Sequence, residues 1–404
     1  MSLITAIPKA KTKIWSKALD RSIEIRRNLG DFEGHEDGPS VIFTAGIHGN
    51  EPSGIFALLE VLKKLKGSDI PFKGNMYAFA GNLSALREGK RYIDMDLNRL
   101  WSEQIISGSE SALLDNGSVE FNKELPELSE QIHSVLAKNK GPFYLIDLHT
   151  TSSETVPFLT IGDTLRNRAF ALKFPLPVIV GIEEQLNSTV LNYINELGHI
   201  CIGVESGQHD SLSSIENHTA IVWQSLVFAG VIDLTDLDDF TSQYEHLAKT
   251  TVDGKKVFEI RYRHNIDVGE GFAMLPGFLN FQKVKKGQTL ATNIHGNVRS
   301  PETGRIFMPK YQVQGNDGFF MVREIRKFWL KVSEIMRKWK IDFFLPLLPG
   351  IKWYQSERNS LVINNRIARW YVIEIFHLLG YRKEMKEGNR IIMTKRKYDL
   401  EAPE

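Results

Sequence analysis

VIFTAGIHGNEPSGIFALLEVLKKLKG, residues 41–67, joins an apolar run to a helical pattern through a short polar turn. The first seven residues predict a buried strand, because all of them except Thr44 are apolar or glycine. Residues 54–67 have the apolar spacing of an amphipathic helix. His48 and Glu51 lie between these two elements, at the end of the strand. The stretch therefore predicts a strand–helix unit with two candidate functional side chains at its connection.

The same alternation of apolar runs and helical patterns continues to about residue 235. Further strands are expected at four apolar runs, namely 76–81, 143–149, 177–182 and 199–205. Helical patterns lie between them, including 188–197 and 211–229. Because runs that are apolar on both faces alternate with helices, the sequence predicts an α/β domain whose helices cover a largely parallel or mixed sheet.

The pattern changes twice in the second half of the chain. From about residue 250 it becomes rich in glycine and short alternating runs, which predicts a small β domain. From about residue 326 helical patterns return and are followed by a closing strand. We therefore expect an α/β domain over 1–245, a β domain over 250–325 and an α+β extension over 326–404.

The composition is that of an ordinary soluble protein of 404 residues, with 42% hydrophobic and 25% charged residues. Fifty basic residues oppose 49 acidic ones, so the net charge of +1 gives no global field that would recruit nucleic acid or anionic lipid. Cys201 is the only cysteine, which excludes an internal disulfide and every cysteine-cluster metal site. With neither a signal peptide nor a membrane-spanning run, we expect a cytoplasmic protein without nucleic-acid or membrane partners.

His48 and Glu51 are candidate metal ligands, and His149 is the best candidate for a third. Catalytic zinc sites commonly use three protein nitrogen or oxygen ligands and leave one position open. His149 ends the predicted strand at 143–149, where α/β domains place functional residues. Asp147, two residues earlier on the same face, could accept the other N–H of this histidine. Alone, each pattern also fits a helix-start accident or a core histidine, but their combination at strand ends favours a metal site.

Glu205 and the segment 90–101 supply the remaining candidate groups. Glu205 follows another apolar strand, and loss of solvation there would raise its pKa toward the range of a general base. A surface glutamate at a strand terminus is the alternative. Arg91 and Arg99 lie in 90–101, together with Asn98, and arginine can bind a carboxylate or polarise a carbonyl oxygen. A solvated charged loop, or aspartates that only position the arginines, would also fit this pattern.

Four blocks together resemble the succinylglutamate desuccinylase/aspartoacylase family, a branch of the zinc carboxypeptidase fold. They are GIHGNEPSG, RYIDMDLNR, LIDLHTTSS and GVESG, in this order. The resemblance covers roughly residues 40–325. It implies a zinc carboxypeptidase-like mixed sheet flanked by helices, followed by a small β domain. The glycine-rich part of that second domain is similar to biotinyl/lipoyl barrel-sandwich sequences, without the lysine that carries the prosthetic group.

The resemblance also implies roles for individual residues. Three residues match the zinc ligands: His48, Glu51 and His149. Glu205 matches the general base, and Arg91 matches the arginine that polarises the scissile amide carbonyl. Asn98 and Arg99 match the pair that grips a substrate carboxylate. One zinc ion per chain is the implied cofactor.

Two features depart from the family pattern. Aspartoacylase-like members have a further substrate-binding arginine about ten residues ahead of the base, where this chain has Asn195. The tyrosine that some members supply from the β domain has only Tyr311 as a candidate. The resemblance does not cover residues 326–404. We expect their aromatic residues, including Trp329 and Trp339, to form a helical core with basic residues on the wet side, although a nucleic-acid surface is the alternative.

The sequence thus predicts a zinc-dependent deacylase that hydrolyses the amide bond of an N-acyl amino acid or a similar small acylated amine. A metallocarboxypeptidase acting on short peptides is one alternative, and a non-catalytic binding module on the same fold is another. The acyl group, the amine and the oligomeric state are left open.

Overall fold

The computed structural model describes residues 11–109, 117–251, 254–354, 359–364, 372–387 and 390–403. Its strands are β1 (Thr12–Ser16), β2 (Arg21–Ile25), β3 (Asn28–Glu33), β4 (Glu36–Ala45), β5 (Lys73–Ala80), β6 (Phe143–Thr151), β7 (Phe158–Ile161), β8 (Val178–Val180), β9 (Ile200–Gln208), β10 (Val257–Asn265), β11 (Ala273–Met274), β12 (Lys283–Val284), β13 (Thr289–Asn293), β14 (Gly296–Arg299), β15 (Gly304–Phe307), β16 (Asp317–Ile325), β17 (Ile351–Trp353), β18 (Ser360–Asn364), β19 (Tyr381–Glu387) and β20 (Arg390–Lys395).

The α-helices are α1 (Ser53–Lys66), α2 (Leu83–Glu88), α3 (Glu103–Ile106), α5 (Leu125–Lys138), α6 (Leu165–Ala171), α7 (Val190–Glu196), α8 (Leu212–Ala229), α9 (Phe240–Thr250), α10 (Lys327–Lys338) and α11 (Val372–Leu378). Short helical turns are η1 (Leu97–Arg99), η2 (Glu120–Glu124), η3 (Ile182–Glu184), η4 (Leu234–Asp236) and η5 (Ile341–Leu347). No helix among the described residues is long and apolar enough to cross a bilayer.

A mixed sheet of 11 strands forms the centre of the molecule, in the order β12-β15-β16-β10-β8-β7-β9-β6-β4-β5-β3. Strands β5, β4, β6 and β9 run parallel, whereas β7 pairs antiparallel with β9. The strands predicted at 41–47, 76–81, 143–149, 177–182 and 199–205 are confirmed as β4, β5, β6, β8 and β9, within a few residues at each end. The predicted α/β class with a mixed sheet is therefore confirmed.

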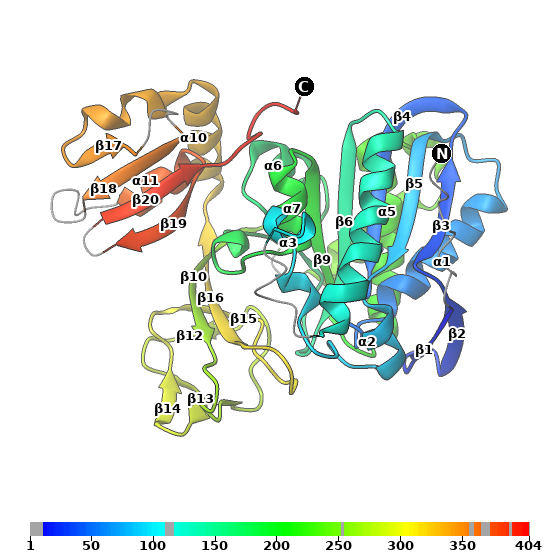
Figure 1. The fold of residues 1–404 in the computed structure, drawn as a ribbon, viewed down its shortest axis with the longest axis horizontal. Helices are drawn as coiled ribbons and strands as arrows, with labels where there is room; N and C mark the ends of the chain where they lie inside the picture. The colour runs from blue at the N-terminus through cyan, green and yellow to red at the C-terminus, as the bar shows by residue number, and fades with distance from the viewer. Residues whose placement is uncertain are drawn as a thin grey trace.

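Helices cover both faces of this sheet, as Figure 1 shows for the right-hand part of the molecule. Successive residues of β4 face opposite sides, so Val41 and Phe43 join one core while Ile42 joins the other. Helices α1 and α8 bury their apolar residues in the first core, and α5 and α7 bury theirs in the second. A strand that is apolar on both faces therefore fixes a three-layer domain.

The region predicted as a β domain continues the central sheet. β10 pairs parallel with β8 and antiparallel with β16, and β15 and β12 extend the sheet further. A separate three-stranded sheet, β11-β13-β14, lies beyond them at the lower left of Figure 1. The loop between β15 and β16 thereby comes to lie close to the carboxyl ends of β6 and β9.

The C-terminal extension has a four-stranded antiparallel sheet, β17-β18-β20-β19, packed with α11 around its own core. Leu361, Phe376 and Tyr381 are among the buried residues of this core. The expected burial is wrong for Trp329 and Trp339, which are 48% and 76% exposed. It is right for other aromatic residues, since Phe376 and Tyr381 lie in the core and Trp353 packs against it. Side chains of the strands and of α11 fill the core. The inner face of α10 is mixed: Ser333 and Arg337 are buried, and Met336 packs against the core.

Candidate metal centre and catalytic pocket

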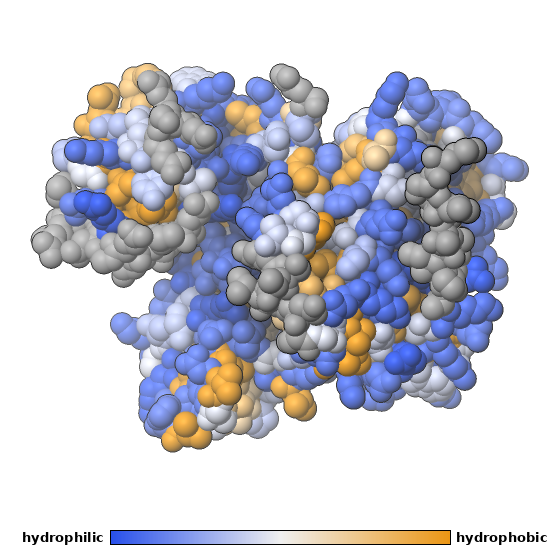
Figure 2. Space-filling view, viewed as in Figure 1, coloured by the Kyte–Doolittle hydropathy of each residue, from blue (hydrophilic) through white to orange (hydrophobic). Residues whose placement is uncertain are grey.

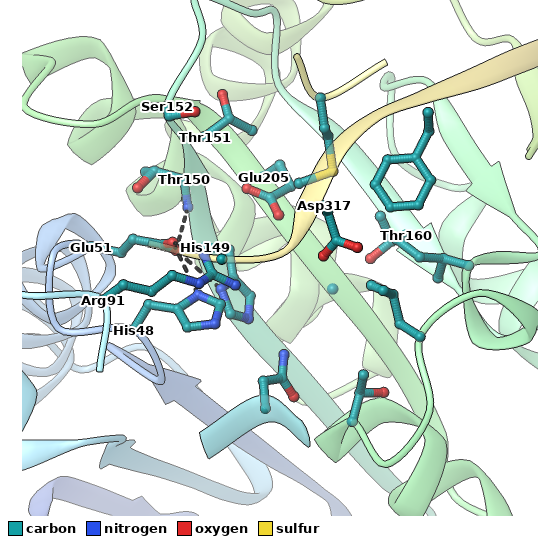
Figure 3. A pocket seen from close by; sticks show the side chains of 18 of the residues that line it. His48, Glu51, Arg91, His149, Thr150, Thr151, Ser152, Thr160, Glu205 and Asp317 are labelled. Carbon is teal, nitrogen blue, oxygen red and sulfur yellow. Dashed lines mark hydrogen bonds and ion pairs between the residues drawn. The ribbon is translucent and has the colours of Figure 1, made fainter. Parts of the chain in front are cut away.

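Three strand ends and one turn bring the predicted site residues together. His48 and Glu51 lie in the turn between β4 and α1, and His149 and Glu205 are paired neighbours on β6 and β9. Figure 3 shows these side chains in one pocket. The backbone at Gly49 lies so close to α2 that a Cβ atom would stand 2.0 Å from a backbone carbon, which explains why glycine is needed in the turn.

The side chains of His48, Glu51 and His149 form a group that can hold a metal ion. Nδ1 of His48 lies 3.0 Å from Oε1 of Glu51, and Nδ1 of His149 lies 3.0 Å from Oε2. All three candidate ligand atoms lie within 4.8 Å of one another, and all three residues are buried. Ligands around a tetrahedral zinc ion at about 2.0–2.2 Å are about 3.3–3.6 Å apart, so this spacing and donor set fit such an ion.

Each histidine of this group has a carboxylate at its other ring nitrogen. Nε2 of His149 lies 2.6 Å from Oδ2 of Asp147, and Nε2 of His48 lies 3.1 Å from Oδ1 of Asp96. Thr44 donates a hydrogen bond of 2.7 Å to the second oxygen of Asp147. Such partners fix the ring orientation and leave Nδ1 for a ligand. The predicted contact of Asp147 is present, whereas the role of Asp96 toward a histidine was missed.

The carboxylates of the group favour positive charge at its centre, which protonated imidazoles supply when no metal is bound. Burial alone would raise the pKa of Glu51, but His48 and His149 lower it well below its usual range. Burial alone would lower the pKa of His149, but Asp147 and Glu51 raise it well above. A single buried carboxylate thus stays ionised between two imidazoles, where it can share a cation with them.

Glu205 and Arg91 face this group from two sides. Glu205 is 9% exposed, and its Oε2 atom has no hydrogen-bond partner among the described residues. Burial raises the pKa of Glu205 well above its usual range. Nη1 of Arg91 lies 3.7 Å from Oε1 of Glu51, and its Nη2 donates to Asp96 at 3.0 Å. The predicted positioning of an arginine by a neighbouring aspartate is therefore present.

Asn98 and Arg99 line the same pocket from η1. The Asn98 amide oxygen accepts a hydrogen bond from the backbone of Val190, and Arg99 donates to Oδ2 of Asp317 at 3.1 Å. Asp317 comes from β16 and also accepts from Arg263 at 2.6 Å. Sequence reasoning missed Asp317, because no local pattern relates it to η1.

Asn195 and Tyr311, at the two positions that depart from the family pattern, are not among the residues that line the pocket. Asn195 uses its amide oxygen to accept from Asn167, 28 residues earlier. The Tyr311 hydroxyl donates to the backbone oxygen of Leu275 and accepts from the backbone of Phe278. The suggestion that Tyr311 serves the pocket is therefore wrong. Three other side chains of its loop line the pocket instead, namely Lys310, Gln312 and Gln314.

Glu183 lines another part of the pocket and was also missed. Its Oε1 atom accepts from Nε and Nη2 of Arg396, at 3.0 and 2.7 Å. Arg396 belongs to the C-terminal extension and is buried, which contradicts its expected place on a wet side. The extension thus contacts a residue of the pocket wall.

Comparison with known proteins agrees with this geometry. Residues 37–222 match the family model described as Succinylglutamate desuccinylase/Aspartoacylase catalytic domain. This part of the chain belongs to that family. A succinylglutamate desuccinylase of Photorhabdus laumondii is 32% identical over 149 residues, which are 35% of this chain and 42% of the relative. The chain thus spans less than half of the length of that curated relative.

Two solved structures share the fold. A succinylglutamate desuccinylase/aspartoacylase from Rhodobacter sphaeroides has a TM-score of 0.53 at 16% identity and covers 79% of this chain and 96% of its own. The ectoine utilization protein EutE (DoeB) from Ruegeria pomeroyi, solved with product bound, has a TM-score of 0.53 at 16% identity, covering 80% and 98%. At this identity the likeness concerns the fold alone.

Proposed function

We propose that the chain is a zinc-dependent deacylase that hydrolyses the amide bond of an N-acyl amino acid or a similar small acylated amine. The observation that carries this proposal is the convergence of His48, Glu51 and His149 beside Glu205, whose Oε2 atom has no hydrogen-bond partner in the described part of the chain. When bound by these three residues, zinc lowers the pKa of a water molecule and polarises a carbonyl oxygen. The remaining steps depend on residues of this chain.

Glu205 is the proposed general base. Its carboxylate takes a proton from the attacking water and delivers it to the amide nitrogen, so that the leaving amine departs neutral. A raised pKa suits this role, because a base near the working pH can both accept and return the proton. Burial beside His149 keeps the carboxylate close to the reacting atoms.

Arg91 is proposed to donate hydrogen bonds to the carbonyl oxygen as negative charge develops on it. Its guanidinium is held by Asp96 at 3.0 Å, so it need not reorganise during the reaction. Asn98 and Arg99 are proposed to bind a carboxylate of the substrate. Because Asp317 already neutralises part of the charge of Arg99, we expect one substrate carboxylate here rather than two.

The test is a panel of N-acyl amino acids assayed with zinc-loaded protein, together with the variant Glu205→Gln. We expect this variant to keep its zinc while turnover falls by about 10²–10⁴-fold, the usual cost of losing a general base. Glu216→Gln is the matched control, because Glu216 is an exposed carboxylate on the same domain. Unchanged turnover in Glu205→Gln would remove Glu205 from the mechanism. Zinc binding without hydrolysis of any panel member would favour a binding module.

A further inference from the structure

The C-terminal extension carries a cluster of exposed apolar side chains that the proposed function does not use. These residues, each between 48% and 80% exposed, are Phe328, Trp329, Ile335, Trp339, Phe343, Phe344, Leu347 and Leu348. They belong to α10, η5 and the residues next to them, and we call them the α10–η5 surface. Figure 2 shows hydrophobic residues on the extension, at the upper left. Exposed apolar side chains gathered on two elements that pack together indicate an interaction site.

The outward direction of this apolar face is fixed by polar contacts on the other side of α10. Phe328, Ile335 and Trp339 share one face, because spacings of seven and eleven residues are close to whole helical turns. Arg337 lies on the opposite side and donates to Asp163 at 2.8 Å and to Asp399 at 3.1 Å. Rotating the helix to bury its aromatic residues would break these buried ion pairs.

Positive charge accompanies the apolar residues. Five lysines of the segment 327–352 are exposed: Lys327, Lys331, Lys338, Lys340 and Lys352. The same segment has two acidic residues, of which Glu334 is exposed and Asp342 is buried against Tyr381 and Lys395. The local excess of positive charge is therefore large in a chain whose net charge is only +1.

We propose that the α10–η5 surface docks onto the headgroup region of a bilayer that contains anionic lipid. Aromatic and leucine side chains would enter the interface, while lysines extend their ammonium groups to the lipid phosphates. A second copy of the chain fits less well, since a two-fold contact would place the lysines of one copy against those of the other. This inference departs from the expectation of no membrane partner, and it is independent of the proposed hydrolysis.

Sedimentation of the full chain with vesicles tests this proposal. We expect binding to vesicles of phosphatidylcholine and phosphatidylserine, and at least about tenfold weaker binding to phosphatidylcholine alone. The pair Trp339→Ser and Phe343→Ser should abolish binding. The pair Lys327→Glu and Lys331→Glu should weaken it by about tenfold or more, because each lysine near an anionic surface contributes about a fivefold factor.

Trp15→Ser is the matched control, because Trp15 is 54% exposed on β1, outside the extension. It should bind vesicles as the unmodified chain does. Circular dichroism should show that every variant is folded, since all the changed residues are exposed. Absence of vesicle binding, or binding that survives the tryptophan and phenylalanine changes, would overturn the proposal. So would a dimer in light scattering that the same changes dissociate, because a second copy would then cover the surface.

Discussion

The metal centre and the contact between the catalytic domain and the extension are both buried clusters of opposite charges, but their partners differ. At the contact, which we call the interface cluster, Arg168 and Arg337 meet Asp163 and Asp399. Arg337 also donates to the backbone oxygens of residues 163, 377 and 378. In the metal centre, by contrast, Nδ1 atoms and carboxylate oxygens converge on one another, and Glu205 keeps an oxygen without a partner among the described residues.

This difference separates a structural cluster from a functional one. Buried charges that are fully paired fix the geometry of the groups that carry them, and they have little capacity left for a ligand. A cluster with converging lone pairs is incomplete without a cation, a water molecule or a substrate. Its arrangement therefore costs stability that a bound metal would restore.

The largest effect is expected when the interface cluster is broken. Arg337→Met should lower the free energy of unfolding by about 3–5 kcal/mol, because it leaves Asp399 buried without its cation and removes one of the two arginines that pair with Asp163. Urea denaturation measures this loss. Lys338→Met, the exposed neighbour that pairs with Glu334, should cost about 0.5 kcal/mol or less. Zinc content per folded chain should be the same in both variants. A loss of less than about 1 kcal/mol in Arg337→Met would show that the two clusters do not differ as described.

The second-largest effect is expected on lowering the pH, because His218 near the metal centre and Asp163 in the interface cluster differ in how acid affects their contribution to stability. Burial lowers the pKa of His218 to about 3, and Ser53 and Ser206 hold its ring behind the metal centre. Burial alone would raise the pKa of Asp163, but Arg168 and Arg337 lower it well below its usual range. Asp163 therefore stays ionised in weak acid, whereas the unfolded chain gains a proton at His218 below about pH 6.5 and the folded chain does not.

Stability should accordingly fall as the pH decreases from about 6.5 toward 3, by up to about 1.4 kcal/mol per pH unit for His218 alone. Urea denaturation of metal-free protein across this range gives the slope. His218→Asn should flatten it by that amount. His295→Asn changes an exposed histidine and should leave it unaltered. If His218→Asn has the same slope of stability against pH as the unmodified chain, burial of His218 is not a source of acid sensitivity.

The smallest effect is a change in KM, which is expected at the contact between Asp317 and Arg99 in the pocket. Asp317 competes for Arg99, so Asp317→Asn should strengthen binding of a substrate carboxylate by about fivefold, or about 1 kcal/mol. The effect should appear as a lower KM, with kcat little changed. Asp267→Asn, an exposed change on the same domain, is the control. A higher KM would mean that Asp317 positions Arg99 rather than neutralising it.

The strand-end pattern was sufficient to predict that His48, Glu51 and His149 come together, whereas their roles were taken from the family resemblance. His48 and Glu51 share one turn, and His149 and Glu205 end apolar runs that could only be central strands, so the parallel sheet brings them together. Asp317, Glu183 and Arg396 act through contacts across more than 200 residues, and no periodic pattern encodes such contacts. They could be assigned only once the structure had placed β16 and the extension beside the pocket.

The extension shows a second limit. The helix expected from about residue 326 is confirmed as α10, but a helical pattern does not say which face meets the protein. Arg337 decides that question through partners on other elements, and the usual assumption that aromatic residues face inward then fails.

The central claim is that His48, Glu51 and His149 hold one catalytic cation. The most direct measurement is the metal content of the purified chain after zinc loading and removal of free metal, for the unmodified chain and for His149→Ala. We predict about one zinc ion per chain in the first and loss of tight zinc binding in the second. Zinc absent from the unmodified chain, or retained equally by His149→Ala, would contradict the account.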